Sequence, residues 1–333
     1  MIAKNMWAVV FEKGSIEPQV RQIPIPQPGP GQVLVRMVAS PINPSDLSFM
    51  RYGAPKTFPF TPGIEGSGTV VAAGPGLYPR LLVGRRVILS ESGYGGAWAE
   101  YMVTRATACV PLRSSLSFEQ GATMLVNPLT ALAIMDMARK GKHKAIANNA
   151  AASALGRMIL RLGKKYGLPV INIVRNQESE DLLRGDGARY ILREETPDFD
   201  ESYRRLAQEL KATFILDAVG GELAARMLDG APAGSFFLAY GNRSEKAMSV
   251  NPLAILLERK VISGFYLRNW AAQIGALGVL RNTIRAQALA PNELQTIIQA
   301  RFPLSQARQA LDTARANPRD GKVLFVMNDA RIG

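Results

Sequence analysis

A strand–turn–helix–strand unit within residues 144–174 constrains the fold of this chain more than any other feature. The apolar segment KAIANNA leads into a turn of small residues, the helix-like GRMILRLGKKYG follows, and PVINIV has strand composition. Further strands and helical stretches alternate from about residue 117, namely ARYILREE, ESYRRLAQELK, ATFILDAVGG, GSFFLAYG and KVISGFYL. Such alternation predicts an α/β domain built on a doubly wound parallel sheet.

The turn of this unit departs from the usual dinucleotide-binding pattern. That pattern is G-x-G-x-x-G, and its three glycine positions hold Ala151, Ser153 and Gly156 here. Gly156 keeps the position that needs close helix–strand packing, and the Ser153 hydroxyl can donate to a phosphate oxygen. A helix starting near Leu155 would direct free N–H groups at a phosphate. The turn is therefore a candidate pyrophosphate site, and a small-residue turn that binds nothing is the alternative.

The end of the next strand bears on the choice of nucleotide. NAD-binding folds place an acidic residue about 20 residues after the turn, where it binds the ribose hydroxyls. This chain has Arg175 there, 19 residues after Gly156. Because a guanidinium offers a planar fork of donors, Arg175 favours the 2′-phosphate of NADP. A surface arginine at a strand end remains the alternative.

The N-terminal third has a different pattern of expected secondary structure. Up to about residue 115 the chain consists of short strand-like segments and turns, such as MWAVVFEKG, GQVLVRMVAS, EGSGTVVAAG and GRRVILS. After about residue 267 come helix-like stretches and a last strand, GKVLFVMND, which we expect to rejoin the first domain.

Composition narrows the functional classes. A single cysteine, Cys109, excludes an internal disulfide framework and favours a reducing, cytoplasmic compartment. No apolar run is long enough for a membrane span, and the N-terminus lacks the apolar stretch of a signal peptide. The net charge of +13 favours acidic partners such as phosphate cofactors and thioesters of coenzyme A. The basic residues are scattered apart from RKGKHK at 139–144, which we interpret as a solvated loop, so a nucleic-acid surface is not expected.

Motifs in a fixed order link the chain to a known family. They are GQVLVRMVASPINPSD, PFTPGIEGSGTVVAAG, GRRV, GAWAEY, GATMLVNPLTA, the turn, LDAVGG and the final GKVLF. In these the chain resembles the medium-chain dehydrogenase/reductase superfamily, in its zinc-free branch of quinone oxidoreductases and enoyl reductases. The resemblance implies a GroES-like, β-rich catalytic domain over residues 1–116 and 267–333 and a Rossmann cofactor domain over 117–266.

Within that branch the turn is most similar to that of mitochondrial-type 2-enoyl thioester reductases, which have serine at the position of Ser153 and bind NADPH. Two departures, Ala154 for a glycine and Gln177 for a second arginine, would weaken NADPH binding or relax the preference over NADH. The resemblance implies cofactor contacts at Asn127, Thr130, Ala152, Ser153, Ala154, Leu155, Gly156, Arg175, Tyr240, Gly241, Phe265, Tyr266, Leu267 and Lys322.

The implied reaction is conjugate reduction of an enoyl thioester or enone. Negative charge would grow on the substrate carbonyl oxygen, where a hydrogen-bond donor stabilises the transition state. The resemblance assigns Tyr52 as that donor, with Asn43 as a second polar candidate; a rim position for Tyr52 and a turn-fixing role for Asn43 and Asp46 are the alternatives. Phe49 and Trp270 are candidate pocket residues.

A zinc-dependent mechanism is not expected. The superfamily's zinc enzymes carry a histidine where this chain has Ile64, and Cys109 and His143 are single residues of their kinds. We expect His143 to be exposed and Cys109 to be packed. Quinone reduction by the same fold, and a crystallin-like or nucleic-acid-binding relative without turnover, are the competing hypotheses. Relatives are commonly homodimers, so we expect a homodimer.

Overall fold

The chain packs as two compact units in its computed structural model. The structure describes residues 4–15, 17–52, 57–90, 96–316 and 321–327. Unit 1 comprises Met1–Leu129, Ile274–Ala290 and Thr296–Gly333, and unit 2 comprises Thr130–Gln273 and Pro291–Gln295. The sequence-based domain boundaries, 116/117 and 266/267, lie 13 and 7 residues before the divisions at 129/130 and 273/274.

Unit 2 is built on a six-stranded sheet in the order β10-β9-β8-β11-β12-β13, and every neighbouring pair is parallel. The strands are β8 (Ile146–Asn148), β9 (Val170–Val174), β10 (Tyr190–Arg193), β11 (Phe214–Asp217), β12 (Phe236–Ala239) and β13 (Val261–Gly264). The strand order reverses between β8 and β11, the point at which ligands bind in doubly wound sheets. The predicted doubly wound parallel sheet is confirmed.

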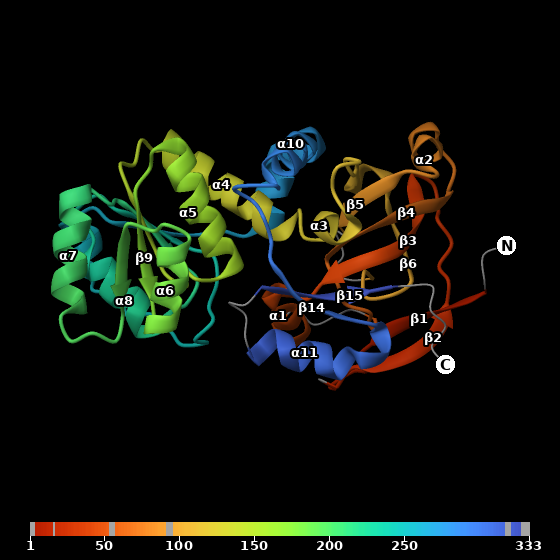
Figure 1. Ribbon diagram of the computed structural model, residues 1–333, viewed down its shortest axis with the longest axis horizontal. Coiled ribbons are helices and arrows are strands. Elements are labelled where there is room, and N and C mark those ends of the chain that lie inside the picture. The colour runs from red at the N-terminus through yellow and green to blue at the C-terminus, as the bar shows by residue number, and fades with distance from the viewer. Residues whose placement is uncertain (1–3, 16, 53–56, 91–95, 317–320, 328–333) are drawn as a thin grey trace. The chain divides into compact units, whose positions relative to one another are not determined.

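Helices cover the sheet of unit 2 (Figure 1). They are α5 (Ala154–Tyr166), α6 (Gln177–Gly185), α7 (Phe199–Leu210) and α8 (Gly221–Gly230), with the short α9 (Pro252–Leu256) before β13. Local signals set their ends: Ser153 and Asn176 cap the N-termini of α5 and α6, and Gly167, at φ 66°, ends α5.

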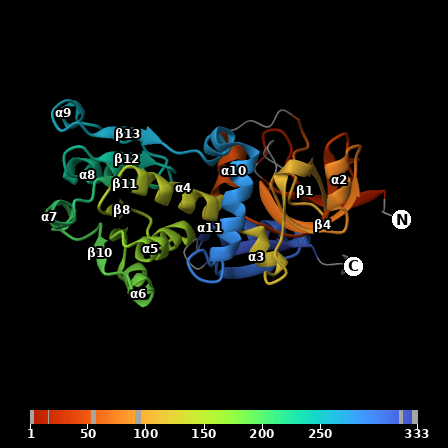
Figure 2. The ribbon, with the colours of Figure 1, turned by 90° about the horizontal axis from the view of Figure 1, so that it is seen from above.

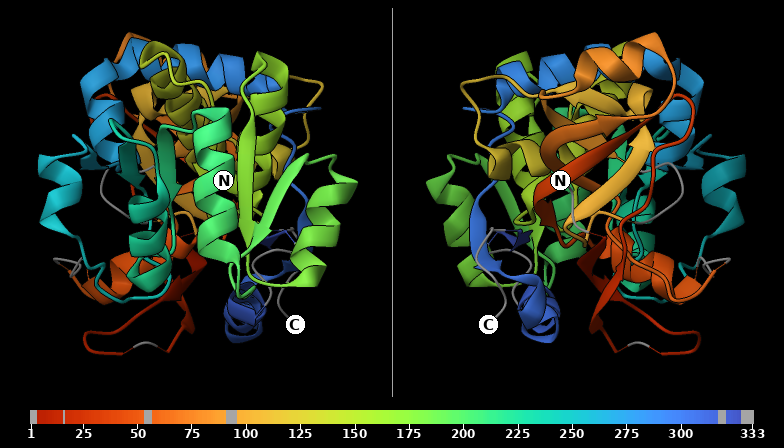
Figure 3. Two further views of the ribbon diagram at one scale, coloured as in Figure 1. Left: turned by 90° about the vertical axis from the view of Figure 1, so that its left-hand side faces the viewer. Right: turned by 90° about the vertical axis from the view of Figure 1, so that its right-hand side faces the viewer.

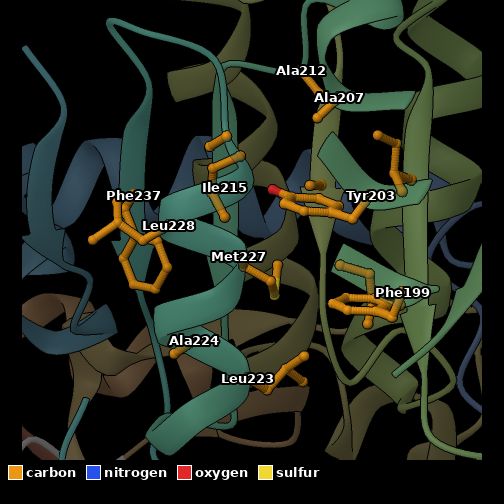
Figure 4. Close-up of a cluster of buried hydrophobic side chains, with 14 of the residues drawn as sticks. Phe199, Tyr203, Ala207, Ala212, Ile215, Leu223, Ala224, Met227, Leu228 and Phe237 are labelled. Carbon is orange, nitrogen blue, oxygen red and sulfur yellow. The ribbon is translucent and has the colours of Figure 1, made fainter. Parts of the chain in front are cut away.

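One core of unit 2 lies between the sheet and helices α7 and α8 (Figure 4). Phe199 and Tyr203 of α7 stack with ring centroids 5.9 Å apart, and Met227 of α8 and Ile215 of β11 are buried in the same cluster. The core therefore packs β8, β9, β11 and β12 against α7 and α8.

Unit 1 contains a mainly antiparallel seven-stranded sheet and a two-stranded ribbon. The sheet runs β14-β15-β3-β4-β5-β7, with β6 paired to β3, and β1 pairs with β2 in the ribbon. The strands are β1 (Asn5–Val10), β2 (Gln19–Pro24), β3 (Gln32–Pro41), β4 (Glu65–Ala73), β5 (Arg86–Ser90), β6 (Tyr101–Arg105), β7 (Cys109–Pro111), β14 (Ile298–Phe302) and β15 (Lys322–Val326). Trp98 and Phe325 meet edge to face in one of its cores, with centroids 5.2 Å apart.

The helices of unit 1 are short, and two further helices run from one unit into the other. Unit 1 holds α1 (Pro44–Tyr52), α2 (Leu77–Leu82), α3 (Phe118–Ala122) and α11 (Ala307–Ala316), with 3₁₀ turns at Ala106–Ala108 and Leu304–Gln306. Helix α4 (Val126–Lys140) begins in unit 1, and α10 (Leu267–Leu289) is two helices joined at Gly275, whose φ of 69° is not helical.

Four strands of unit 1 were not individually expected from the sequence, namely β2, β6, β7 and β14. β2 carries the polar sequence QVRQIP, and the half-buried β14 follows a long helix without a turn signal such as Asn-Gly. The last strand, β15, pairs antiparallel with β3 and parallel with β14, so the chain's end returns to the sheet of unit 1.

Candidate functional site

The small-residue turn between β8 and α5 has the geometry of a phosphate-binding turn. Ser153 is the N-cap of α5, and its Oγ accepts a hydrogen bond from the Gly156 amide at 3.2 Å. A Cβ on Gly156 would lie only 2.3 Å from the carbonyl oxygen of Ala151, so the residue there must be glycine. Ala150 takes a left-handed φ of 49°, which closes the turn without a glycine.

This turn leaves polar groups for a ligand at the start of α5. The amides of Ala154 and Leu155 precede the first intrahelical hydrogen bond, and both residues are half-buried. Because the Ser153 oxygen already accepts from Gly156, its hydroxyl hydrogen is left to donate. Ala152 is buried under the turn. Together with the positive end of the helix dipole, these groups suit a pyrophosphate.

A buried polar network joins β8 to β11, where the strand order of the sheet reverses. The Asn149 side chain donates to Asp217 Oδ1 at 2.5 Å and accepts from the Ala218 amide at 2.8 Å. Asp217 Oδ1 also accepts from the amides of Val219 and Gly220, each at 3.0 Å. These bonds fix the two loops that border the crevice at the carboxyl ends of β8 and β11.

Asn148, the last residue of β8, lies fully buried beside this network. Its Oδ1 accepts from the Tyr240 hydroxyl at 3.3 Å, whereas its Nδ2 has no partner among the residues that the structure describes. Burial, with Asp217 nearby, raises the pKa of Tyr240, so the phenol stays protonated as the donor. An unpaired buried amide is costly, and it is consistent with a ligand or water in the crevice.

Gly241 and the segment after β13 occupy the neighbouring strand ends. A Cβ on Gly241 would lie 3.0 Å from the Ala218 carbonyl oxygen, so the β12 loop passes close to the β11 loop. The Phe265 amide donates to Ala239 at 2.7 Å; Phe265 and Leu267 are half-buried and Tyr266 is exposed. The structure thus brings these sequence-predicted residues to the same sheet edge as the turn.

Arg175 follows β9 directly and is exposed. Burial raises the pKa of Glu194, and the positive charge of Arg175 partly opposes that rise. Asn176 caps α6 by accepting from the Ser179 amide at 3.1 Å. Arg175 therefore stands at a strand end with an exposed guanidinium and one acidic neighbour, an arrangement that can accept a phosphate.

Unit 1 holds a second candidate centre, a buried network of Asn43, Glu65 and Lys322. The Lys322 ammonium donates to Asn43 Oδ1, and Asn43 Nδ2 donates to Glu65 Oε1 at 2.9 Å. Burial lowers the pKa of Lys322 against the attraction of Glu65 and Asp46, and burial raises the pKa of Glu65 against the attraction of Lys322. The sequence predicted Lys322 as a cofactor contact and Asn43 as a residue near the substrate. In the structure the Lys322 ammonium and the Asn43 side-chain oxygen are bonded to each other.

Asp46 adjoins this network and fixes the loop before α1. Its two oxygens accept from the amides of Asn43 at 2.8 Å and Ile64 at 3.0 Å. Burial, added to by the negative charge of Glu65, raises its pKa from 3.8 to about 7. The bond from Asn43 closes the first turn of α1, which corresponds to the turn-fixing role considered for Asp46.

Several sequence-predicted residues lie elsewhere or outside the description. Tyr52 is the last residue of α1, and its side chain, like that of Phe49, lies outside the described part of the chain. Asn127 is half-buried in the first turn of α4, and Thr130 is buried one turn later. Trp270 is half-buried in α10.

His143 and Cys109 are not placed as metal ligands. The expectation that His143 is exposed was wrong: it is half-buried, its Nδ1 lies 2.8 Å from Thr213 Oγ1, and its ring stacks on Phe214. Cys109 is buried, as expected, and burial raises its pKa to about 12. Within the described ranges no three His, Cys, Asp or Glu side chains form a group that could hold a metal ion.

Sequence inspection missed the partners that organise both centres. Asn149 and Asp217 each stand at the end of an apolar strand segment. A polar residue in that position is the sequence signal by which they could have been found. Glu65 carried no such signal, because its partners lie 22 to 61 residues away in the sequence. Among the helices that the structure describes, none is long and apolar enough to cross a membrane.

Comparisons with known proteins agree with this fold. Residues 29–114 match the alcohol dehydrogenase GroES-like domain. The mitochondrial enoyl-[acyl-carrier-protein] reductase of Caenorhabditis elegans is 30% identical over 267 residues, which cover 77% of this chain and 75% of the relative. The Arabidopsis thaliana protein of the same name is 28% identical over 276 residues, 79% of this chain and 72% of the relative.

Solved structures match over nearly the whole chain. The crystal structure of a candidate NADPH:quinone reductase from Mesorhizobium loti superposes with a TM-score of 0.90 at 32% identity, covering 98% of this chain and 100% of the other. The Escherichia coli quinone oxidoreductase, in complex with NADPH, has a TM-score of 0.85 at 21% identity, covering 96% and 100%, and shows the shared fold.

Proposed function

This chain belongs to the medium-chain dehydrogenase/reductase superfamily, in its branch of quinone oxidoreductases and mitochondrial-type enoyl reductases, and we propose that it reduces an activated carbon–carbon double bond with NADPH. The observation that carries the proposal is the turn at the start of α5. Its free amides, the Ser153 hydroxyl and the close packing at Gly156 match the needs of a bound pyrophosphate.

The cofactor contacts expected from the sequence are assigned to parts of NADPH. We assign the pyrophosphate to the turn from Ala152 to Gly156, the 2′-phosphate to Arg175, and further contacts to Asn127, Thr130, Tyr240, Gly241, Phe265, Tyr266 and Leu267. The reduced nicotinamide supplies a hydride when it is bound. The polar network of Asn149 and Asp217 supports this assignment, because it holds the bordering loops in place. NADH remains an alternative, since Ala154 and Gln177 depart from the NADPH-binding pattern.

At the substrate we assign the hydrogen-bond donor to Tyr52. Its hydroxyl would donate to the carbonyl oxygen on which negative charge develops, and an unperturbed phenol is protonated at neutral pH. Asn43 is the weaker candidate, because its Oδ1 and Nδ2 already bind Lys322 and Glu65. Lys322 is correspondingly reassigned from a cofactor contact to a partner of Asn43. Ile64 in the histidine position of the zinc enzymes supports a reaction without metal.

Quinone reduction is the second candidate, favoured by the M. loti relative, which covers almost the entire chain. The test is NADPH oxidation by the purified protein with three classes of acceptor: crotonyl coenzyme A and longer enoyl thioesters, simple enones, and quinones. We expect the enoyl thioesters or enones to be turned over with the highest kcat/KM. Turnover of quinones alone would move the function to the second candidate. Binding of nucleic acid without any turnover would support the non-catalytic alternative.

We also propose a homodimer formed through the free edge of the sheet of unit 2. Val261 and Ile262 of the edge strand β13 are 49% and 37% exposed, and Leu256 and Leu257 beside it are more than 70% exposed. Figure 2 shows α9 and β13 together at this edge, and the left view of Figure 3 shows the same cyan segment at the rim of the unit. An exposed apolar edge strand favours pairing with a second copy.

Sedimentation velocity tests the dimer. Wild type should sediment as a dimer, and Leu256→Glu should shift it toward monomer; a wild-type monomer at micromolar concentration would contradict the proposal.

The cytoplasmic location expected from the single cysteine also stays a prediction, because the curated relatives are named as mitochondrial.

A further inference from the structure

Helix α4 begins without a capping residue of its own. It starts at Val126, so the residue before it is Leu125, whose side chain has no oxygen to accept from the helix amides. Pro128, the third residue of the helix, has no amide hydrogen. Asn127, assigned above to the cofactor, lies in this same first turn. The turn therefore needs an acceptor from elsewhere in the chain.

Glu65 supplies that acceptor from the start of β4. Its Oε2 accepts from the amides of Leu125 and Val126, each at 3.0 Å, and its side chain is buried, with the residue 2% exposed. A carboxylate at a helix N-terminus also interacts favourably with the helix dipole. All of these groups belong to unit 1. A buried carboxylate thus takes the place of the missing N-cap.

The hydrogen bonds behind Glu65 all run in one direction. Lys322 donates to Asn43, Asn43 donates to Glu65 Oε1, and both oxygens of Glu65 act only as acceptors. The Lys322 ammonium can only donate. If the Asn43 amide were flipped, its NH₂ group would face the ammonium, and two donors would meet. The side chain of residue 65 must therefore accept a hydrogen bond at both of its terminal atoms, one from Asn43 and the other from the amides of α4. A carboxylate has two acceptor oxygens, whereas an amide has only one.

We infer that Glu65 is a positioning residue for the cofactor: by capping α4 it holds Asn127 in the orientation in which Asn127 contacts NADPH. The inference rests on the proposed function, which assigns Asn127 to the cofactor. Glu65 itself touches neither substrate nor cofactor. Its effect is transmitted through the first turn of α4.

The test begins with Glu65→Gln. The amide places one NH₂ against either Asn43 Nδ2 or the two helix amides, so the cap is weakened. We expect faster hydrogen exchange at Leu125 and Val126, and an NADPH dissociation constant raised about tenfold, the effect of losing a charged group at a helix end. The kcat at saturating NADPH should change less than the dissociation constant.

A second substitution provides the rescue. With Lys322→Gln added, residue 322 can accept from Asn43, Asn43 can accept from Gln at position 65, and that Gln can accept from the helix amides. The double variant should therefore bind NADPH more tightly than Glu65→Gln alone. Thr104→Val is the matched control: it removes another buried hydrogen bond of unit 1, from Thr104 Oγ1 to the Ser90 carbonyl at 3.0 Å, without touching α4. It should lower stability and leave the NADPH affinity unchanged.

The outcomes separate the inference from the proposed function. If wild type binds NADPH and Glu65→Gln binds it equally well, or the double variant is no better than the single one, Glu65 does not position the cofactor. If Thr104→Val weakens NADPH as much as Glu65→Gln, the effect is general destabilisation and the inference is likewise overturned. A wild type that binds no NADPH overturns the proposed function, and the inference with it.

Discussion

The substitution Gly156→Ala tests the turn at the start of α5. Its new Cβ would lie 2.3 Å from the carbonyl oxygen of Ala151 and 2.7 Å from that residue's carbonyl carbon and Cα. These are backbone atoms, so no side-chain rotation relieves the overlap. To restore an ordinary contact of about 3.4 Å, the turn and the helix must separate by about 1 Å.

Two effects should follow from that separation. Overpacking of this kind costs about 1–3 kcal/mol, and the backbone clash at Gly156 points to the upper end. NADPH should bind roughly 100-fold more weakly, because two displaced amide–phosphate bonds at about 1.5 kcal/mol each account for that factor. Urea unfolding measures the first effect and fluorescence titration with NADPH the second.

Gly185→Ala is the control within the same unit. Gly185 is the last residue of α6, and a Cβ there meets no atom within 4 Å. Alanine should stabilise the helix by up to about 1 kcal/mol and leave NADPH binding unchanged. Wild-type stability and wild-type NADPH affinity in Gly156→Ala would show that the turn neither requires glycine at position 156 nor binds the pyrophosphate.

Three further predictions concern single residues. Arg175→Ala should weaken NADPH by about 1–3 kcal/mol and NADH hardly at all, as titration with both cofactors will show; equal losses would remove Arg175 from the 2′-phosphate site. Tyr52→Phe should lower kcat by about 10²- to 10³-fold at constant cofactor affinity, and a change of only a few fold in steady-state assays would make Tyr52 a rim residue. The pKa of Asp46 is raised from 3.8 to about 7 in the folded protein, so the folded state binds this proton more tightly than the unfolded chain does. The contribution of Asp46 to the free energy of unfolding therefore falls as the pH rises from about 4 to about 7. The advantage of wild type over Asp46→Asn in urea unfolding should shrink across that interval, by at most about 4 kcal/mol at 1.36 kcal/mol per unit, and a constant advantage would contradict the shift.

The features that could be predicted from the sequence are those set by residues close together in the chain. The apolar segments of unit 2 alternate with helical stretches, and each became a strand of the parallel sheet. Gly156 was recognised because a local pattern defines its position. Arg175 follows a buried strand, so its place at a strand end could also be expected.

Contacts between distant segments could not be predicted in the same way. Lys322 and Asn43 meet across 279 residues, and no local periodicity reports that a lysine at the start of β15 is buried. His143 was expected to be exposed because it follows three basic residues and a glycine in RKGKHK, yet Thr213 and Phe214 of a distant strand region bind it. β14 was missed because its half-buried residues lack the alternation of a surface strand.

In the proposed reaction a hydride passes from NADPH to the β-carbon of an activated alkene. The reaction is tested by reducing crotonyl coenzyme A with NADPH that carries deuterium at both C4 positions of the nicotinamide, followed by mass spectrometry and NMR of the product. We expect butyryl coenzyme A with one deuterium, transferred from C4, at the β-carbon, and a solvent-derived hydrogen at the α-carbon. A product without deuterium at the β-carbon, or no consumption of NADPH with any enoyl thioester or enone, would contradict it.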